Sequence, residues 1–190
     1  MLSRIKGRQW HALKRSRIGK DSHAKFSSKS STFMMSAGSH TEGESAAPPS
    51  FIERAKVSGA NALLGQFTSG GGFDRSVSGL TIDRITDGSV KCSFPVQKGN
   101  SNAYGTVHGG CLATLVDVVG TLAILSRDPL KAGVSVDLNV SYCSASKIGN
   151  DLSIEGKLLK MGKRMAFTEV TFMEKGTNKI VATGRHTKAL

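Results

Sequence analysis

A polar, glycine-bearing turn that opens into a long apolar helix constrains this 190-residue chain more than any other feature. From Asn102 to Asp117 the residues read Asn-Ala-Tyr-Gly-Thr-Val-His-Gly-Gly-Cys-Leu-Ala-Thr-Leu-Val-Asp. From Gly109 to Ser126 apolar residues fall on nearly every face, which is typical of a helix enclosed by the rest of a domain. Asp117 is the one charged residue of this segment.

The position of Asp117 predicts chemistry when it is considered together with the start of its helix. A buried ionised carboxylate is unfavourable unless it is paired, hydrogen-bonded or placed at a pocket. The alternative is a structural aspartate that caps a loop or faces solvent. If Asp117 is considered without its neighbours, this alternative is favoured. However, His108, Gly109 and Gly110 begin the same helix, where free backbone N–H groups and the helix dipole favour a negatively charged oxygen. The two features together predict an oxyanion site and a base.

Composition predicts one globular domain behind a basic tail, since 38% of the residues are hydrophobic and 21% are charged. Most of the net charge of +12 lies in the first 40 residues, which hold nine Lys or Arg and a single acid, Asp21. Residues 1–35 are similar to an organellar targeting segment, with the mitochondrion as the expected destination and plastid or cytosol as alternatives. A basic extension without a targeting role is the structural alternative. Residues 36–49 are small, polar and end in two prolines, which predicts a disordered linker. The domain is expected at 50–190.

Several classes of function are not expected from this composition. The three cysteines, Cys92, Cys111 and Cys143, form no C-x-x-C pair and lack zinc-ligand spacing, so no metal site is predicted. Nucleic-acid binding is not expected, because the basic run lies in the tail and the domain has few aromatic residues for base stacking. No membrane span is expected, because the longest apolar segment contains Asp117 and lies at the short limit for crossing a bilayer.

The pattern after the linker predicts an α+β fold. A helix is expected to begin at Ser50, which has capping-box spacing to Glu53, and Gly65–Ser78 is expected to be a loop. Asp87 and Gly88 predict a hairpin turn. Strands are predicted at Leu80–Ile85, Val90–Pro95, Val134–Tyr142, Leu152–Leu159, Met165–Met173 and Ile180–Thr187. These elements predict one antiparallel sheet of five to six strands wrapped around one long central helix.

The ordered set of motifs closely resembles the hotdog-fold acyl-coenzyme A thioesterases, including the phenylacetate-degradation type. Four segments carry the resemblance: Asn102–Gly110, Asp117, Gly133–Asn139 and the ending Gly184–Lys188. The resemblance implies a hotdog fold and hydrolysis of an acyl-coenzyme A thioester to a free carboxylic acid and coenzyme A. It implies no metal or organic cofactor, since coenzyme A is part of the substrate.

The resemblance also implies roles for individual residues. Asp117 matches the catalytic carboxylate, acting as general base or nucleophile, and Gly109 matches the residue whose N–H polarises the thioester carbonyl. Asn102 matches the side chain that orients water or the thioester, His108 the residue that supports this loop, and Ser135 the hydroxyl that positions water. Substrate and coenzyme A contacts are matched by Ser135, Tyr142, Lys160, Met161, Gly162, Lys163, Arg164 and Met165. Three basic residues of the last strand, Arg185, His186 and Lys188, are further candidates for phosphate contacts.

Geometry adds an expectation about assembly. Gly109 and Asp117 are eight positions apart, so on one helix they lie about 12 Å apart, too far to act on the same carbonyl carbon. We therefore expect a shared site, with Asp117 of one subunit facing Gly109 and Asn102 of the other, in a homodimer or a dimer-of-dimers tetramer. Two alternatives remain open at this point: a hotdog acyl-coenzyme A hydratase or dehydratase, and a non-catalytic acyl-coenzyme A binding protein.

Overall fold

The structure, a computed structural model, describes residues 50–70 and 72–190 of the chain. The targeting segment expected at 1–35 and the linker expected at 36–49 lie outside the described residues. The described residues all belong to one compact unit, which ends at Leu190 and contains the predicted domain.

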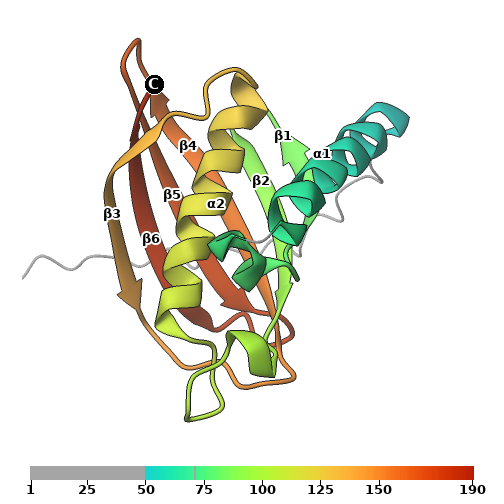
Figure 1. The fold of residues 1–190 in the computed structure, drawn as a ribbon, viewed down its shortest axis with the longest axis vertical. Coiled ribbons are helices and arrows are strands. Elements are labelled where there is room, and N and C mark those ends of the chain that lie inside the picture. The colour runs from blue at the N-terminus through green and yellow to red at the C-terminus, as the bar shows by residue number, and fades with distance from the viewer. Residues whose placement is uncertain (1–49, 71) are drawn as a thin grey trace, which may run out of the picture. The chain divides into compact units, whose positions relative to one another are not determined.

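Six antiparallel strands form one sheet, and a long helix lies across its inner face (Figure 1). The strand order is β1-β2-β4-β5-β6-β3, with α1 preceding the first strand and α2 inserted between β2 and β3. This arrangement confirms the predicted α+β fold. The bounds of the elements are α1 Phe51–Ser69, η1 Phe73–Val77, β1 Thr81–Thr86, β2 Ser89–Pro95, η2 Lys98–Asn100, α2 Gly109–Arg127, β3 Val134–Tyr142, β4 Asp151–Met161, β5 Met165–Glu174 and β6 Ile180–Ala189.

Helix α2 lies close to the sheet because small residues stand at the crossing points. A Cβ atom at Gly120 would lie 2.7 Å from Oγ1 of Thr168, and one at Gly184 would lie 2.5 Å from Cγ2 of Val116. The side chains of Leu115, Val116, Val119 and Ile124 are buried between helix and sheet. By length and composition alone α2, with a mean hydropathy of 1.8, would be able to cross a membrane. Its buried face packs on the sheet, as the core helix of a globular domain does.

Helix α1 begins where the sequence predicts. The Ser50 side chain accepts a hydrogen bond from the Glu53 amide, and the Glu53 carboxylate accepts one from the Ser50 amide. The prediction of a loop over Gly65–Ser78 is wrong for most of its length, because α1 continues to Ser69 and η1 comes after it. Tertiary contacts outweigh the glycine here: Leu64 is buried in the core, and the buried Thr68 hydroxyl donates back to the Leu64 carbonyl.

The two edges of the sheet differ. At β1 the Asn61 side chain donates to the Ile82 carbonyl (2.9 Å) and accepts from the Ile82 amide (2.8 Å), so α1 occupies that edge. At β3 nothing in the described part of the chain covers the edge, and large apolar side chains are exposed along it: Val134, Val136, Leu138 and Tyr142. The strand predicted at Val134–Tyr142 is confirmed. The prediction that the rest of the domain encloses α2 is wrong, because the side of α2 that carries Asp117 is only half-buried.

Candidate active site

The loop before α2 is organised by the side chain of Asn102. Its Oδ1 accepts hydrogen bonds from the amides of Tyr104 (3.0 Å) and Thr106 (3.2 Å), and its Nδ2 lies 3.0 Å from the Thr106 hydroxyl. Gly105 closes the turn at φ 72°, a conformation that glycine adopts without strain. Asn102 therefore fixes the approach of the chain to the helix, as a short polar side chain does in an Asx turn.

The first turn of α2 leaves backbone donors unused. His108 is the N-cap, and its Nδ1 accepts from the Gly110 amide at 2.8 Å, so the neutral imidazole carries its proton on Nε2. The Gly109 amide has no acceptor among the described residues. The hydroxyl of Tyr142 on β3 donates to the Gly109 carbonyl at 3.2 Å and ties the helix start to the sheet. A free N–H at the positive end of the helix dipole is a suitable donor for an oxyanion.

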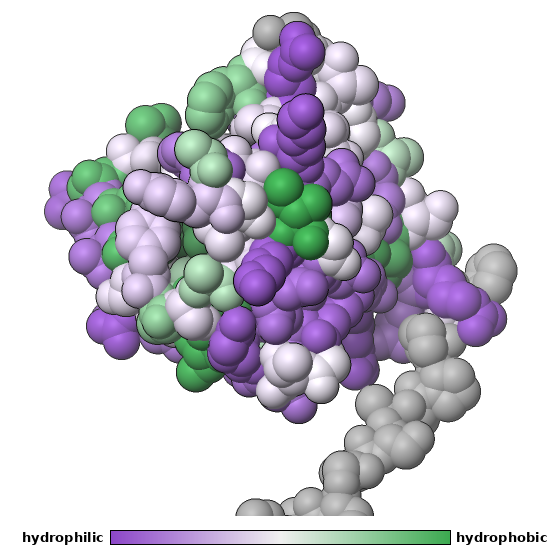
Figure 2. Space-filling model, turned by 90° about the horizontal axis from the view of Figure 1, so that it is seen from below, coloured by the Kyte–Doolittle hydropathy of each residue, from purple (hydrophilic) through white to green (hydrophobic). Residues whose placement is uncertain are grey.

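The end of the domain that carries this turn is seen in Figure 2. Most side chains there are hydrophilic, and hydrophobic ones are scattered between them. His108 and Gly110 are exposed and Gly109 is half-exposed, so the free amide is reached from a polar, solvent-facing surface.

Asp117 lies in the middle of α2, in contact with donors from the helix and from β6. Its Oδ1 lies 3.4 Å from the Thr121 hydroxyl, 3.6 Å from Nδ1 of His186 and 3.7 Å from Nζ of Lys188. The Asp117 side chain is 46% exposed. One side of the carboxylate therefore contacts donors from the sheet, and the other side is open to solvent. The sequence pattern predicts instead that apolar neighbours enclose the carboxylate.

His186 links the carboxylate to β3. Its side chain is fully buried, with Nε2 2.9 Å from the Ser135 hydroxyl and Nδ1 facing Asp117. Burial lowers the pKa of His186, and the neighbouring Asp117 carboxylate acts in the opposite direction. The imidazole is therefore favoured in its neutral form, between the hydroxyl and the carboxylate.

The structure separates the three basic residues of the last strand that are candidates for phosphate contacts. Of the three, only Arg185 is exposed, and it pairs with Glu169 at 3.4 Å on the outer face of the sheet. His186 and Lys188 are buried beneath Asp117. His186 and Lys188 are two residues apart in a strand, so their side chains lie on the same face of the sheet as the small residue Gly184. This alternation is the sequence signal that predicts a buried position for both side chains.

The residues predicted to bind coenzyme A do not form one cluster. Lys160 and Met161 end β4, Gly162 to Arg164 form the turn, and Met165 begins β5, with the Gly162 amide donating to the Met165 carbonyl at 2.8 Å. The turn lies at the end of the sheet opposite to the first turn of α2, whereas Tyr142 contacts Gly109 (Figure 1). Lys160, Lys163 and Arg164 are exposed, and among the described residues none of them pairs with a carboxylate.

Two of the three cysteines are buried. Burial raises the pKa of Cys111, in the first turn of α2, to about 11 and that of Cys92 to about 12, so both stay protonated thiols near neutral pH. Cys143 is exposed. Within residues 50–70 and 72–190 no group of three or more His, Cys, Asp or Glu side chains is placed to hold a metal ion.

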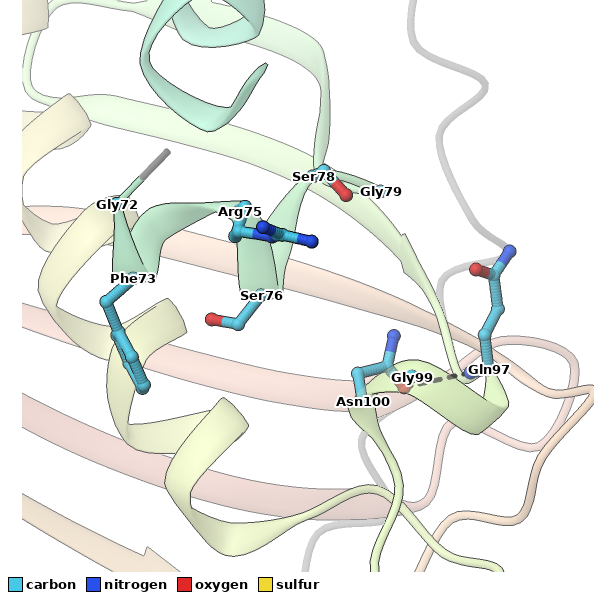
Figure 3. A pocket seen from close by; sticks show the side chains of 9 residues that line it. All are labelled: Gly72, Phe73, Arg75, Ser76, Ser78, Gly79, Gln97, Gly99 and Asn100. Carbon is cyan, nitrogen blue, oxygen red and sulfur yellow. Dashed lines mark hydrogen bonds between the residues drawn. The ribbon is translucent and has the colours of Figure 1, made fainter. Parts of the chain in front are cut away.

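Two cavities formed by the described residues lie away from Asp117. The larger, about 630 Å³, lies between η1 and η2 and is lined by residues that include Phe73, Arg75, Ser76, Gln97 and Asn100 (Figure 3). A second, of about 370 Å³, lies on the outer face of β3, β5 and β6. Neither is lined by Asp117 or Gly109.

Comparison with known proteins identifies relatives of this chain. The sequence profile of the Thioesterase superfamily matches residues 104–181. Human acyl-coenzyme A thioesterase 13 is 43% identical over 128 residues, which cover 67% of this chain and 91% of that protein. The crystal structure of zebrafish thioesterase superfamily member 2 is 38% identical, with a TM-score of 0.69, and the match covers 70% of this chain and 97% of that one.

A third relative was solved with a ligand. The structure of a hypothetical thioesterase from Streptococcus pneumoniae with coenzyme A is 26% identical, with a TM-score of 0.56, and the match covers 60% of this chain and 88% of that one. The family and the hotdog fold expected from the motifs are confirmed by these matches together with the sheet and the central helix. The chain belongs to the thioesterase superfamily.

Proposed function

We propose that this protein hydrolyses acyl-coenzyme A thioesters to a free carboxylic acid and coenzyme A. The name of the human relative and the coenzyme A bound to the Streptococcus pneumoniae relative support this substrate class. The observation that carries the proposal is that one helix bears both a solvent-accessible carboxylate, Asp117, and a backbone amide without an acceptor, Gly109. Each is a group that thioester hydrolysis needs, as base and as oxyanion donor.

The site is shared between two subunits in this proposal. Both groups lie on α2, about 12 Å apart, and the side of α2 next to β3 is uncovered. The open β3 edge with its exposed apolar side chains supports pairing with a second copy, since such an edge favours association. In a homodimer, or a tetramer made of two dimers, Asp117 of one subunit then faces Gly109 and Asn102 of its partner.

The proposed reaction is consistent with these positions. Asp117 accepts a proton from a water molecule, which attacks the thioester carbonyl carbon, and the Gly109 amide donates to the oxygen that becomes negatively charged. The carbon–sulfur bond then breaks, and the proton passes from Asp117 to the thiolate of coenzyme A. Removing one oxyanion donor typically costs about 10²-fold to 10³-fold in rate. Ser135 helps to hold the water and Asn102 the thioester. Asp117 acting as nucleophile is the other possibility for its role.

The phosphates of coenzyme A are bound, in this proposal, by the turn between β4 and β5. Lys160, Lys163 and Arg164 are exposed there without acidic partners among the described residues, so their charges are available to an anionic ligand.

We also propose that residues 1–35 direct the protein to mitochondria, on the basis of their composition alone.

One observation favours a second function, hydration or dehydration of an acyl thioester. His186 lies 3.6 Å from Asp117, and a histidine with a carboxylate is the pair expected in hotdog hydratases. The products separate the two functions, because only hydrolysis releases a free thiol.

The test is thiol release from acyl-coenzyme A esters of short, long and aromatic acyl groups, measured with a thiol reagent. We expect Asp117→Asn to lower kcat by at least about 10²-fold, as for other general bases. Comparable turnover by a folded Asp117→Asn variant would overturn the assigned role. Unchanged ligand after prolonged incubation with the wild-type protein would identify a binding protein instead.

A further inference from the structure

Lys188 is an unusual lysine because its charged end is buried. Its side chain is only 8% exposed, and its Nζ lies 2.7 Å from the Thr121 hydroxyl and 3.7 Å from Oδ1 of Asp117. These are its polar side-chain contacts in the described part of the chain. A buried ammonium is unfavourable unless it is paired and hydrogen-bonded, so its stability in this place depends on the carboxylate.

Two periodicities bring the group together. On β6 the alternation of side chains places His186 and Lys188 on the inner face. On α2 a spacing of four places Asp117 and Thr121 one turn apart on the side that meets those two residues. The Thr121 hydroxyl accepts from Lys188 and donates to Asp117, so it connects the ammonium with the carboxylate.

All of these contacts reach the same carboxylate oxygen. Thr121, His186 and Lys188 lie against Oδ1 of Asp117, and Oδ2 accepts no hydrogen bond from the described residues. Because the two oxygens are held in one plane with the carbon, fixing Oδ1 also fixes the direction of Oδ2. With the side chain 46% exposed, Oδ2 is the oxygen left for a water molecule.

We infer that Lys188 and Thr121 are positioning residues, which hold Oδ1 of Asp117 so that the ionised Oδ2 faces the reacting water. This inference rests on the proposed function. The charged and titratable groups that face the cluster are Lys188 and His186 from β6, and Asp137 from β3 acts electrostatically on His186. Among them, Lys188 places a positive charge 3.7 Å from the carboxylate.

Lys188→Met is the first test, because it removes the charge and keeps most of the side-chain volume. We expect kcat to fall about tenfold, as for loss of a hydrogen bond to a charged group, with KM within about twofold of the wild type. Lys91→Met, at an exposed position of β2, is the matched control and should change neither quantity.

Thr121→Val and Thr121→Ser form a second, independent pair that perturbs packing less. We expect the valine variant to lose kcat and the serine variant, which keeps the hydroxyl, to retain it. Wild-type kcat in a folded Lys188→Met protein, or equal kcat in the two Thr121 variants, would overturn the inference. Measuring Asp117→Asn in parallel distinguishes failure of the proposed function from failure of the positioning role. Full activity in that variant contradicts the proposed function. Loss of activity in that variant, with normal activity in the Lys188 and Thr121 variants, contradicts only the positioning role.

Discussion

At the scale of single residues, the Gly109 amide is a group that one substitution can remove without removing the helix. Gly109 is the first residue of α2, and proline is well tolerated at that position because its missing N–H has no partner inside the helix. His108 has φ −71° and ψ 135°, which is the conformation preferred before proline. Gly109→Pro should therefore fold and lower kcat about 10²-fold to 10³-fold by removing the oxyanion donor.

Gly109→Ala is the matched control for this substitution. It keeps the N–H, and its Cβ would lie 3.4 Å from the Tyr142 ring, an ordinary van der Waals contact. Thiol-release assays should show most activity in the alanine variant and loss in the proline variant. Equal activity of the two folded variants would mean that another group stabilises the oxyanion.

The sequence indicates Asp117 and Gly109 as candidates but not the residues around Asp117. The two candidates are indicated by a charge in an apolar helix and by a glycine pair at its start. The partners of Asp117 are not indicated, because strand alternation shows that His186 and Lys188 share a face but not which helical residue crosses above them. That crossing depends on the distance between helix and sheet, which a pattern along one chain does not encode.

At the scale of elements, replacing a helical glycine with alanine should have opposite effects on stability at two positions. Gly59 lies on the exposed side of α1, where an added Cβ meets nothing within 4 Å, so Gly59→Ala should stabilise the protein by about 0.5–1 kcal/mol. Gly120 faces the sheet, where a Cβ would lie 2.7 Å from the buried Thr168 hydroxyl, so Gly120→Ala should destabilise it by about 1–3 kcal/mol. Denaturant unfolding measures both, and a stabilised Gly120→Ala variant would mean that the helix can move away from the sheet.

The same two glycines show which elements a sequence can specify. Strands and the central helix are predicted to within about two residues because their burial has a period that the sequence carries. The end of α1 is missed because Gly65 indicates a loop, whereas burial of Leu64 against the core extends the helix. Local propensity fails where a tertiary contact of this kind outweighs it.

At the scale of the whole molecule, the half-buried side of α2 and the open β3 edge support the proposal that the working unit contains two chains. Apolar side chains such as Val134, 73% exposed, and Val136, 59% exposed, would not be stable in water along so long an edge. A sequence pattern shows that these residues are apolar, but it does not show whether the same chain or a second copy covers them.

Mixing two inactive variants tests whether the site is shared. Asp117→Asn and Gly109→Pro should each be inactive as homodimers, because each lacks one group at both sites. In a mixed dimer one site receives the intact Asp117 from one subunit and the intact Gly109 from the other, while the second site has neither. Random assortment makes half of the dimers mixed, so co-refolding equal amounts should restore about a quarter of the wild-type activity.

The control for this experiment is the same mixture without subunit exchange, which should stay inactive. Co-expression with two different affinity tags isolates the mixed dimer, and light scattering gives its mass. If Asp117 and Gly109 act within one chain, every chain in the mixed dimer is defective and no activity returns. A folded mixed dimer without thiol release would therefore exclude the shared site, and restored activity would require that α2 of one subunit supplies the base while α2 of its partner supplies the oxyanion donor.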